Sequence, residues 1–211
     1  MNHTITIPFE QQDGSTSDPT EAITAALAAD TTLLLGHSAY GDQTLFDDEI
    51  AALKSAVSKF GTTLTNLVVG ISVGSEDLCS ISAARVAAKS GFGAGPVVLV
   101  SCISQVRAAV MGTGLASVQI GHVDKVSAWA NSCNSAVVSV VDWLGIDIYP
   151  YLETETDFNG IDNDSGVLQD EYGLTSDVGK GKPVWVTGTG WPNSAPWASC
   201  PEHQQYKEIL G

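Results

Sequence analysis

Basic residues are scarce in this chain and unevenly placed. Its 211 residues include 9 Lys and Arg against 24 Asp and Glu, which gives a formal net charge of −15. The first basic residue is Lys54, and none lies between Lys125 and Lys180. Because phosphate groups are bound by clustered Lys and Arg, this deficit excludes nucleic acids and anionic membranes as expected partners. The scarcity of basic residues is compatible with an uncharged ligand such as a carbohydrate.

Long apolar runs, metal motifs and phosphate loops are missing as well. No apolar stretch reaches the roughly 18 residues that a membrane-spanning helix needs, and the first ten residues lack the basic and apolar regions of a signal peptide. No Gly-rich loop follows a predicted strand, so a nucleotide site lacks support. The cysteines lack C-x-x-C or zinc-like spacing, so we expect no metal and no cofactor. Disulfides and free thiols both stay open for Cys79, Cys102, Cys133 and Cys200.

What the chain does contain is a regular alternation of β-rich runs and helical patterns. This alternation is typical of βα units around a parallel sheet. About six strands are predicted, over residues 4–7, 32–35, 67–73, 118–120, 143–148 and 182–187. A closed barrel needs eight strands and about 250 residues. We therefore expect an α/β fold of the (β/α)8 TIM-barrel type that lacks one or two strands at the termini, in a single domain over residues 1–211. An open doubly wound sheet is the alternative.

Several helices have recognisable boundaries in the sequence. Asp18, Pro19 and Glu21 predict a helix start, with the acid at the N-cap and Pro at the first position. A second helix is expected near residues 78–89. Residues 97–100 are rich in β-formers, but apolar residues at helical spacing through residue 110, together with Pro96, favour a helix. A last helix is expected over residues 201–211.

The residues that follow the predicted strands are the candidates for chemistry. In parallel α/β folds the functional site lies at the carboxyl ends of the strands. Aromatic rings stack on the apolar faces of sugars, while carboxylate, hydroxyl and imidazole groups bond the sugar hydroxyls, so these side chains predict a carbohydrate site. The residues concerned are Ser75, Glu76, His122, Tyr149, Tyr151, Glu153 and Trp191.

Four segments of the chain resemble fungal glycoside hydrolase family 17, which contains β-1,3-glucan hydrolases and transglucosylases. They are residues 70–78 (GISVGSEDL), 121–124 (GHVD), 142–153 (DWLGIDIYPYLE) and 182–192 (KPVWVTGTGWP). The resemblance runs in register from about residue 31 to residue 191. It implies a (β/α)8 barrel, a retaining mechanism on β-1,3-glucan of the fungal cell wall, and an extracellular or cell-wall location. A monomer is expected.

The resemblance assigns two catalytic positions, and only one carries a suitable side chain. Glu76 matches the family's acid/base, although its position also suits a helix first-turn acid stabilised by the dipole. Where the family has its nucleophile, in Thr-Glu-Thr-Gly-Trp-Pro, this chain has Gly188. Glycine cannot form the covalent glycosyl-enzyme of a retaining glycosidase. We therefore expect impaired hydrolysis.

Three explanations for Gly188 remain open. It is an engineered substitution, or natural decay in a non-catalytic paralogue, or its role has passed to another carboxylate. Departures from the family pattern elsewhere, such as Cys79 in place of Tyr, favour decay. Asp147 and Glu153 are the candidates for the third explanation, which ranks lowest. The competing function is that of a non-catalytic β-glucan-binding or cell-wall structural protein.

The remaining candidates are assigned to substrate contact. His122 suits equally a packed interior residue and a partner for a sugar hydroxyl, and Asp124 suits a cap of the helix that follows it. Of Tyr149 and Tyr151, we expect only one to line the site. Trp191 is expected to contact sugar, whereas Trp143 and Trp185 lie within strands and are expected in the core.

Overall fold

The computed structural model describes residues 4–8, 19–39, 41, 43–82, 86, 93–150 and 164–190. Three of the candidate site residues, Tyr151, Glu153 and Trp191, lie outside these residues, and so does the helix expected over residues 201–211. The strands are β1 (Thr4–Pro8), β2 (Thr32–His37), β3 (Val68–Ser75), β4 (Ile120–Asp124), β5 (Trp143–Ile148) and β6 (Val184–Thr189). The helices are α1 (Glu21–Ala28), α2 (Gln43–Thr65), α3 (Asp77–Ser80), α5 (Pro96–Val110), α6 (Val126–Ala130), the 3-10 turn η1 (Ser132–Asn134), α7 (Ser135–Val140) and α8 (Asp164–Gly179).

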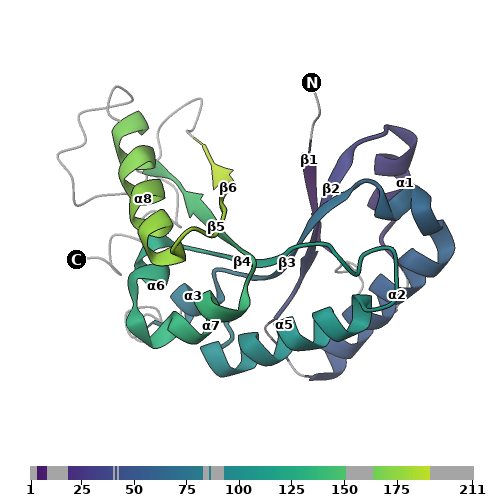
Figure 1. Cartoon of the computed structure of the whole chain (residues 1–211), viewed down its shortest axis with the longest axis horizontal. Helices are drawn as coiled ribbons and strands as arrows, with labels where there is room; N and C mark the ends of the chain where they lie inside the picture. Colours follow the sequence, from purple (N-terminus) through teal and green to yellow (C-terminus); the bar gives the residue numbers. More distant parts are fainter. Residues whose placement is uncertain are drawn as a thin grey trace, which may run out of the picture.

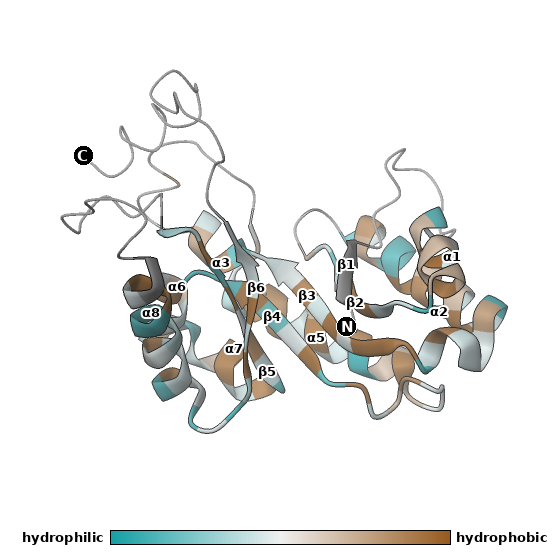
Figure 2. Ribbon diagram, turned by 90° about the horizontal axis from the view of Figure 1, so that it is seen from above, coloured by the Kyte–Doolittle hydropathy of each residue, from teal (hydrophilic) through white to brown (hydrophobic). Residues whose placement is uncertain are grey.

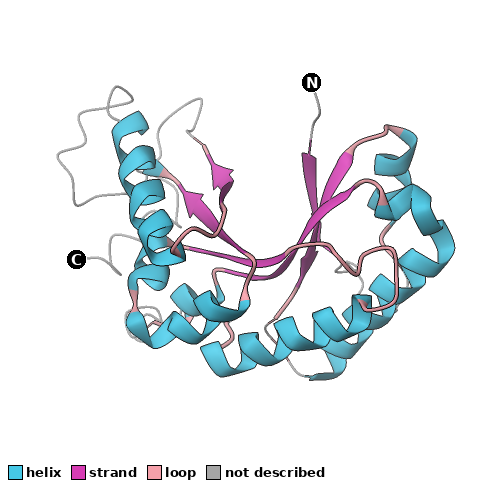
Figure 3. Ribbon diagram, in the orientation of Figure 1, coloured by secondary structure: helices cyan, strands magenta, loops and turns pink. Residues whose placement is uncertain are grey.

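The six strands form one parallel sheet in the order β1-β2-β3-β4-β5-β6, so each strand pairs with its neighbours along the chain. The sheet is curled, and helices cover its outer face (Figures 1 and 3). Sequential parallel strands with an outer helix layer are the arrangement of a (β/α)8 barrel, which has eight strands. The structure therefore confirms a partial barrel of this type, with six strands among the described residues.

Apolar side chains fill both faces of the sheet. On the outer face, Ile71 and Ile146 are buried against helices, and α5 contributes Leu99 and Ile103 to the same core. Figure 2 shows this apolar character along the central strands and on the helices beside them. The inner face holds a smaller cluster of Leu34, Val123 and Trp143, against which Trp185 packs. The two indoles are stacked with ring centroids 4.6 Å apart, as expected for core residues.

The helix that begins at Pro96 confirms the expectation drawn from its helical spacing. Leu99, Ile103 and Val106 are buried along α5, so packing of one helical face outweighs the β propensity of its valines. The start of α1 differs from the prediction. Its N-cap is Thr20, whose hydroxyl accepts a hydrogen bond from the amide of Ala22 at 3.4 Å, and Asp18 lies outside the described residues.

The helix expected near residues 78–89 is described as the four-residue α3, and residues 83–85 and 87–89 of its expected span lie outside the described residues. One boundary near the site differs from the prediction. Strand β4 extends to Asp124, so His122 and Asp124 lie within the strand and do not follow it. Gly121, the second residue of this strand, has a packing role, because a Cβ on it would overlap the ring of Trp143.

Candidate active site

Glu76 follows β3 directly and has an unusual backbone conformation. Its φ of 54° and ψ of 22° lie in the left-handed region, where a residue other than glycine costs about 1–3 kcal/mol. The residue is the N-cap of α3, but its side chain makes no capping bond. Its carboxylate instead lies 3.6 Å from Nζ of Lys125 and is 29% exposed. The side chain is thus left available at the end of the strand.

Asp77, the next residue, stabilises the turn through hydrogen bonds to its carboxylate. Its carboxylate accepts hydrogen bonds from the amide of Ser75 at 2.8 Å and from the amide of Ala94 at 3.0 Å. Burial raises the pKa of Asp77, while the charge of His122 and the two amide donors oppose the rise. The role of first-turn acid in α3, which was the alternative considered for Glu76, therefore belongs to Asp77.

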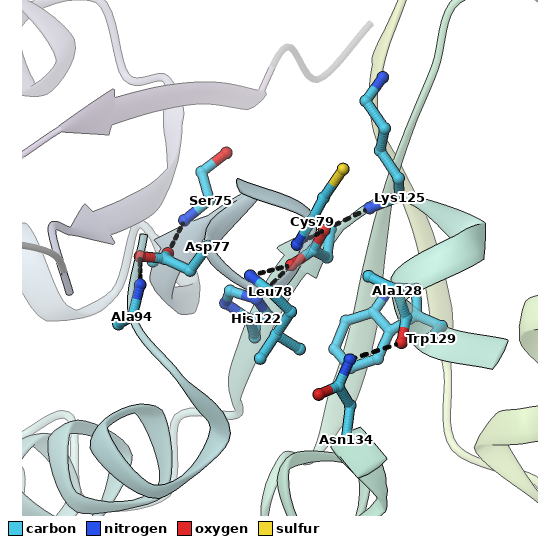
Figure 4. Close-up of polar contacts among 12 residues, drawn as sticks. Ser75, Asp77, Leu78, Cys79, Ala94, His122, Lys125, Ala128, Trp129 and Asn134 are labelled. Atoms are coloured by element: carbon cyan, nitrogen blue, oxygen red, sulfur yellow. Dashed lines mark hydrogen bonds and ion pairs between the residues drawn. The ribbon is translucent and has the colours of Figure 1, made fainter. Parts of the chain in front are cut away.

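Asp124 holds the same turn from the neighbouring strand. Its fully buried carboxylate accepts hydrogen bonds from the amides of Leu78 at 2.8 Å, Cys79 at 3.3 Å and Lys125 at 2.8 Å (Figure 4). The amide of Glu76 donates to the carbonyl of Val123 at 2.9 Å. The expectation that Asp124 caps the following helix is wrong in its main point, because the helix whose amides it binds is α3. Its distant position in the sequence conceals this contact.

His122 lies between the sheet and α6. Its Nδ1 is 2.7 Å from the carbonyl oxygen of Val73, its Nε2 is 3.1 Å from Oδ2 of Asp124, and its ring packs edge-on against Trp129. Both of these neighbours are hydrogen-bond acceptors. The side chain is fully buried. This position favours the packing interpretation over direct contact with a sugar.

Gly188 lies near the end of β6, beside Asp147 of β5. The pairing register between these strands shifts after Ile146, and the shift brings Asp147 opposite Gly188. A Cβ on Gly188 would lie 2.6 Å from Oδ1 of Asp147 and 2.9 Å from the hydroxyl of Tyr149. The position that the family resemblance assigns to the nucleophile is therefore bordered by a carboxylate and a phenol.

Asp147 is held in place by its other neighbour in β6. The hydroxyl of Thr187 lies 2.8 Å from Oδ1 of Asp147. Burial raises the pKa of Asp147, and the Thr187 hydrogen bond and the charge of Lys125 act in the opposite direction. Lys125 thus contacts Glu76 and also acts electrostatically on Asp147. The charge of Lys125 therefore acts on both carboxylates.

The structure brings together part of the predicted site. Ser75, Glu76, Tyr149 and Gly188 all lie at the carboxyl ends of strands, whereas His122 lies within the sheet–helix layer. Asp77 and Thr187 were not predicted as site residues, and neither was Lys125. Its signal was its place directly after the GHVD motif, at the edge of a long segment without basic residues. Among the described residues, no three or more His, Cys, Asp or Glu side chains gather as a metal site.

Comparison with known proteins places this geometry in context. The BtgE/BtgC glycoside hydrolase domain matches residues 14–207. A protein from Aspergillus oryzae named probable glucan endo-1,3-beta-glucosidase is 50% identical over 183 residues, which cover 87% of this chain and 39% of that protein. The chain thus spans about two fifths of the length of the curated relatives it matches.

Solved structures of glycoside hydrolase family 17 are also similar to this chain. The glycoside hydrolase family 17 beta-1,3-glucanosyltransferase from Rhizomucor miehei is 26% identical, with a TM-score of 0.63 over 82% of this chain and 55% of that one. An active-site mutant of this enzyme in complex with laminaritriose gives a TM-score of 0.64 with the same identity and coverage. These matches confirm the resemblance drawn from the four motifs. With Glu76 held at the end of a barrel strand and a family match over most of its length, the chain belongs to the BtgE/BtgC glycoside hydrolase domain family.

Proposed function

We propose that this chain is a glycoside hydrolase-type domain that acts on β-1,3-glucan, with Glu76 as its acid/base and with a retaining route impaired at Gly188. The names of its relatives and the laminaritriose complex of its structural neighbour support this substrate class. The observation that carries the proposal is the turn at Glu76. Glu76 is a strained residue in a turn whose flanking amides, those of Ser75 and Leu78, donate hydrogen bonds to the carboxylates of Asp77 and Asp124. Its own carboxylate makes no capping bond, and this combination is typical of a functional site.

The proposed chemistry follows from the positions of the two strand ends. Glu76, when protonated, donates its proton to the glycosidic oxygen as the bond to the anomeric carbon breaks. A retaining enzyme then needs a carboxylate that attacks the anomeric carbon from the other side. Gly188 supplies no such group, so no glycosyl-enzyme forms at that position. Ser75 and Tyr149, with Tyr151, Glu153 and Trp191, are the proposed sugar-contacting residues.

Turnover of laminaripentaose by the purified chain tests the catalytic part of this proposal. We expect slow release of shorter oligosaccharides that is abolished in Glu76→Gln and unchanged in Glu21→Gln. Glu21 is a matched control because it is an exposed carboxylate on α1. Equal turnover in wild type and Glu76→Gln would remove Glu76 from the mechanism.

A second candidate function is a non-catalytic β-glucan-binding or cell-wall structural protein, and the absence of a side chain at Gly188 favours it. Calorimetry with laminaritriose separates the two. A pure binding protein keeps its affinity in Glu76→Gln, loses affinity in Trp191→Ala and shows no turnover. Absence of binding in the wild type would contradict both functions.

The cellular setting belongs to the same proposal. We propose an extracellular or cell-wall location, a monomeric state, and one barrel-type domain over residues 1–211. The negative charge of the chain is compatible with a neutral polysaccharide. None of the helices among the described residues is long and apolar enough to cross a membrane.

A further inference from the structure

We propose that Asp147 serves as the second carboxylate of this site, as a general base that activates water, so that the domain hydrolyses its substrate with inversion of configuration. This inference rests on the proposed glycosidase function. It concerns a residue that lies on the neighbouring strand and does not occupy the family's nucleophile position.

The position of Asp147 relative to Gly188 is the first support. Asp147 and Gly188 are paired across β5 and β6, and paired residues of neighbouring parallel strands point to the same face of a sheet. Oδ1 of Asp147 lies 2.6 Å from the point where a Cβ on residue 188 would be. The carboxylate therefore lies at the site that a side chain from Gly188 would enter.

The depth of this carboxylate favours inversion. A glutamate at position 188 would carry its carboxyl carbon two bonds beyond Cβ, or about 2.5 Å further along the side chain. The carboxyl carbon of Asp147 lies one bond beyond its own Cβ, and Asp147 is paired with Gly188, so its carboxylate reaches about 1.3 Å less far into the site than that of a glutamate at position 188. Retaining glycosidases hold their carboxyl groups about 5–5.5 Å apart and inverting ones about 6.5–9.5 Å apart. Adding about 1.3 Å to the retaining separation gives about 6.3–6.8 Å, which reaches the lower end of the inverting range.

The surroundings of Asp147 suit a base. The hydroxyl of Thr187 at 2.8 Å fixes the carboxylate, and the hydroxyl of Tyr149 lies near the same point and can orient a water molecule. Burial raises the pKa of Asp147, which makes its ionised form a stronger base. Lys125 acts on both this carboxylate and Glu76, and so links the two halves of the site.

The step balances with water as the second reactant. The carboxylate of Asp147 accepts a proton from water as the water oxygen forms a bond to the anomeric carbon. The bond between that carbon and the glycosidic oxygen breaks, and Glu76 gives its proton to the leaving oxygen. The new reducing end has the α configuration, Asp147 is left protonated, and Glu76 is left ionised. Exchange of protons with solvent restores both groups.

Proton NMR during laminaripentaose hydrolysis tests this assignment, because it records which anomer appears before mutarotation. We compare the wild type, Asp147→Asn and Asp48→Asn, an exposed control on α2. The Asn side chain keeps an acceptor for Thr187, and calorimetry with laminaritriose shows whether each variant still binds. We expect the α anomer first in the wild type, a loss of turnover of about 10²- to 10⁴-fold in Asp147→Asn with binding kept, and no loss in Asp48→Asn.

Other outcomes overturn the inference and are separable from failure of the proposed function. The β anomer as first product, or undiminished turnover in Asp147→Asn, would remove Asp147 as the base while leaving the glycosidase function in place. Binding of laminaritriose without any turnover would overturn the role of Asp147 and support the non-catalytic function. Neither binding nor turnover in the wild type would overturn the proposed function itself.

Discussion

Replacing Asp124 by Asn tests whether one buried carboxylate holds the turn that carries Glu76. Oδ2 of Asp124 receives the amide of Leu78 at 2.8 Å and faces Nε2 of His122 at 3.1 Å, while Oδ1 receives the amides of Cys79 and Lys125. An asparagine amide offers one acceptor oxygen. If that oxygen keeps the partners of Oδ1, its NH₂ group faces the amide of Leu78, and two donors meet.

The magnitude follows from these contacts. Nε2 of His122 can accept a hydrogen bond from the new NH₂ group, so the contact between these two side chains survives. The amide of Leu78 loses a charge-assisted hydrogen bond of about 1.5–3 kcal/mol, and the remaining bonds weaken because the acceptor is neutral. We expect the free energy of unfolding of Asp124→Asn to fall by about 2–4 kcal/mol.

Urea unfolding followed by circular dichroism measures this change. The exposed control Asp48→Asn is expected to stay within about 0.5 kcal/mol of the wild type. If Asp124→Asn were equally close to the wild type, the carboxylate would not be what holds α3, and the account of the Glu76 turn would be refuted. Loss of stability with no loss of glucan turnover would separate the role of Asp124 in folding from its role in positioning Glu76.

Three further predictions concern other residues. Gly188→Ala places a Cβ 2.6 Å from Oδ1 of Asp147, so we expect its free energy of unfolding in urea to fall by about 1–2 kcal/mol. Gly173→Ala has open space around it in α8 and should raise the free energy of unfolding by about 0.5–1 kcal/mol. Higher stability in both variants would contradict the close packing at Gly188. Burial raises the pKa of Asp147 above its ordinary 3.8, so the folded chain holds this proton more tightly, and the resulting stability is present below pH 3.8 and lost as pH rises through the folded pKa. Asp147→Asn should therefore be more stable than wild type in urea at neutral pH, with the difference shrinking as the pH falls toward 3.8, and an unchanged difference would refute the shift. Burial raises the pKa of Cys102 to about 11, so iodoacetamide at pH 8 should modify the exposed Cys133 first in mass spectra of the folded chain, and equal rates would contradict the buried thiol.

The sequence predicts the architecture well because its signals are local. Each β-rich run, such as the one that contains Asp147, and the helical spacing after Pro96 can be recognised within a dozen residues. The missed features depend on register between strands. That Asp124 binds the amides of α3 follows from how β3 and β4 pair, and that Asp147 faces Gly188 follows from a shift between β5 and β6. No local pattern encodes either.

The candidate site also combines features that can be predicted from the sequence with features that depend on the fold. Glu76 could be assigned from its motif, but its left-handed backbone and its contact with Lys125 required the structure. His122 has the same sequence context whether it faces sugar or helix, and only the extension of β4 shows that it faces α6. The alternation of strands and helices implies a helix between β5 and β6, but the bounds of α8 could not be predicted because it is largely polar, with only a few apolar residues packed on the core.

The sequential order of the strands implies an order in which the parts of the site form during synthesis of the chain. Every pairing in the described sheet joins strands that are neighbours in the chain, so the sheet can grow at one edge while the chain is being synthesised. The turn that carries Glu76 becomes fixed when β4 docks, because Val123 and Asp124 supply its partners. The set of residues around Asp147 becomes complete only when β6 adds Thr187 and Gly188. The proposed acid is therefore in place before the proposed base, and β6, the last of the described strands to form, determines whether the pair is complete.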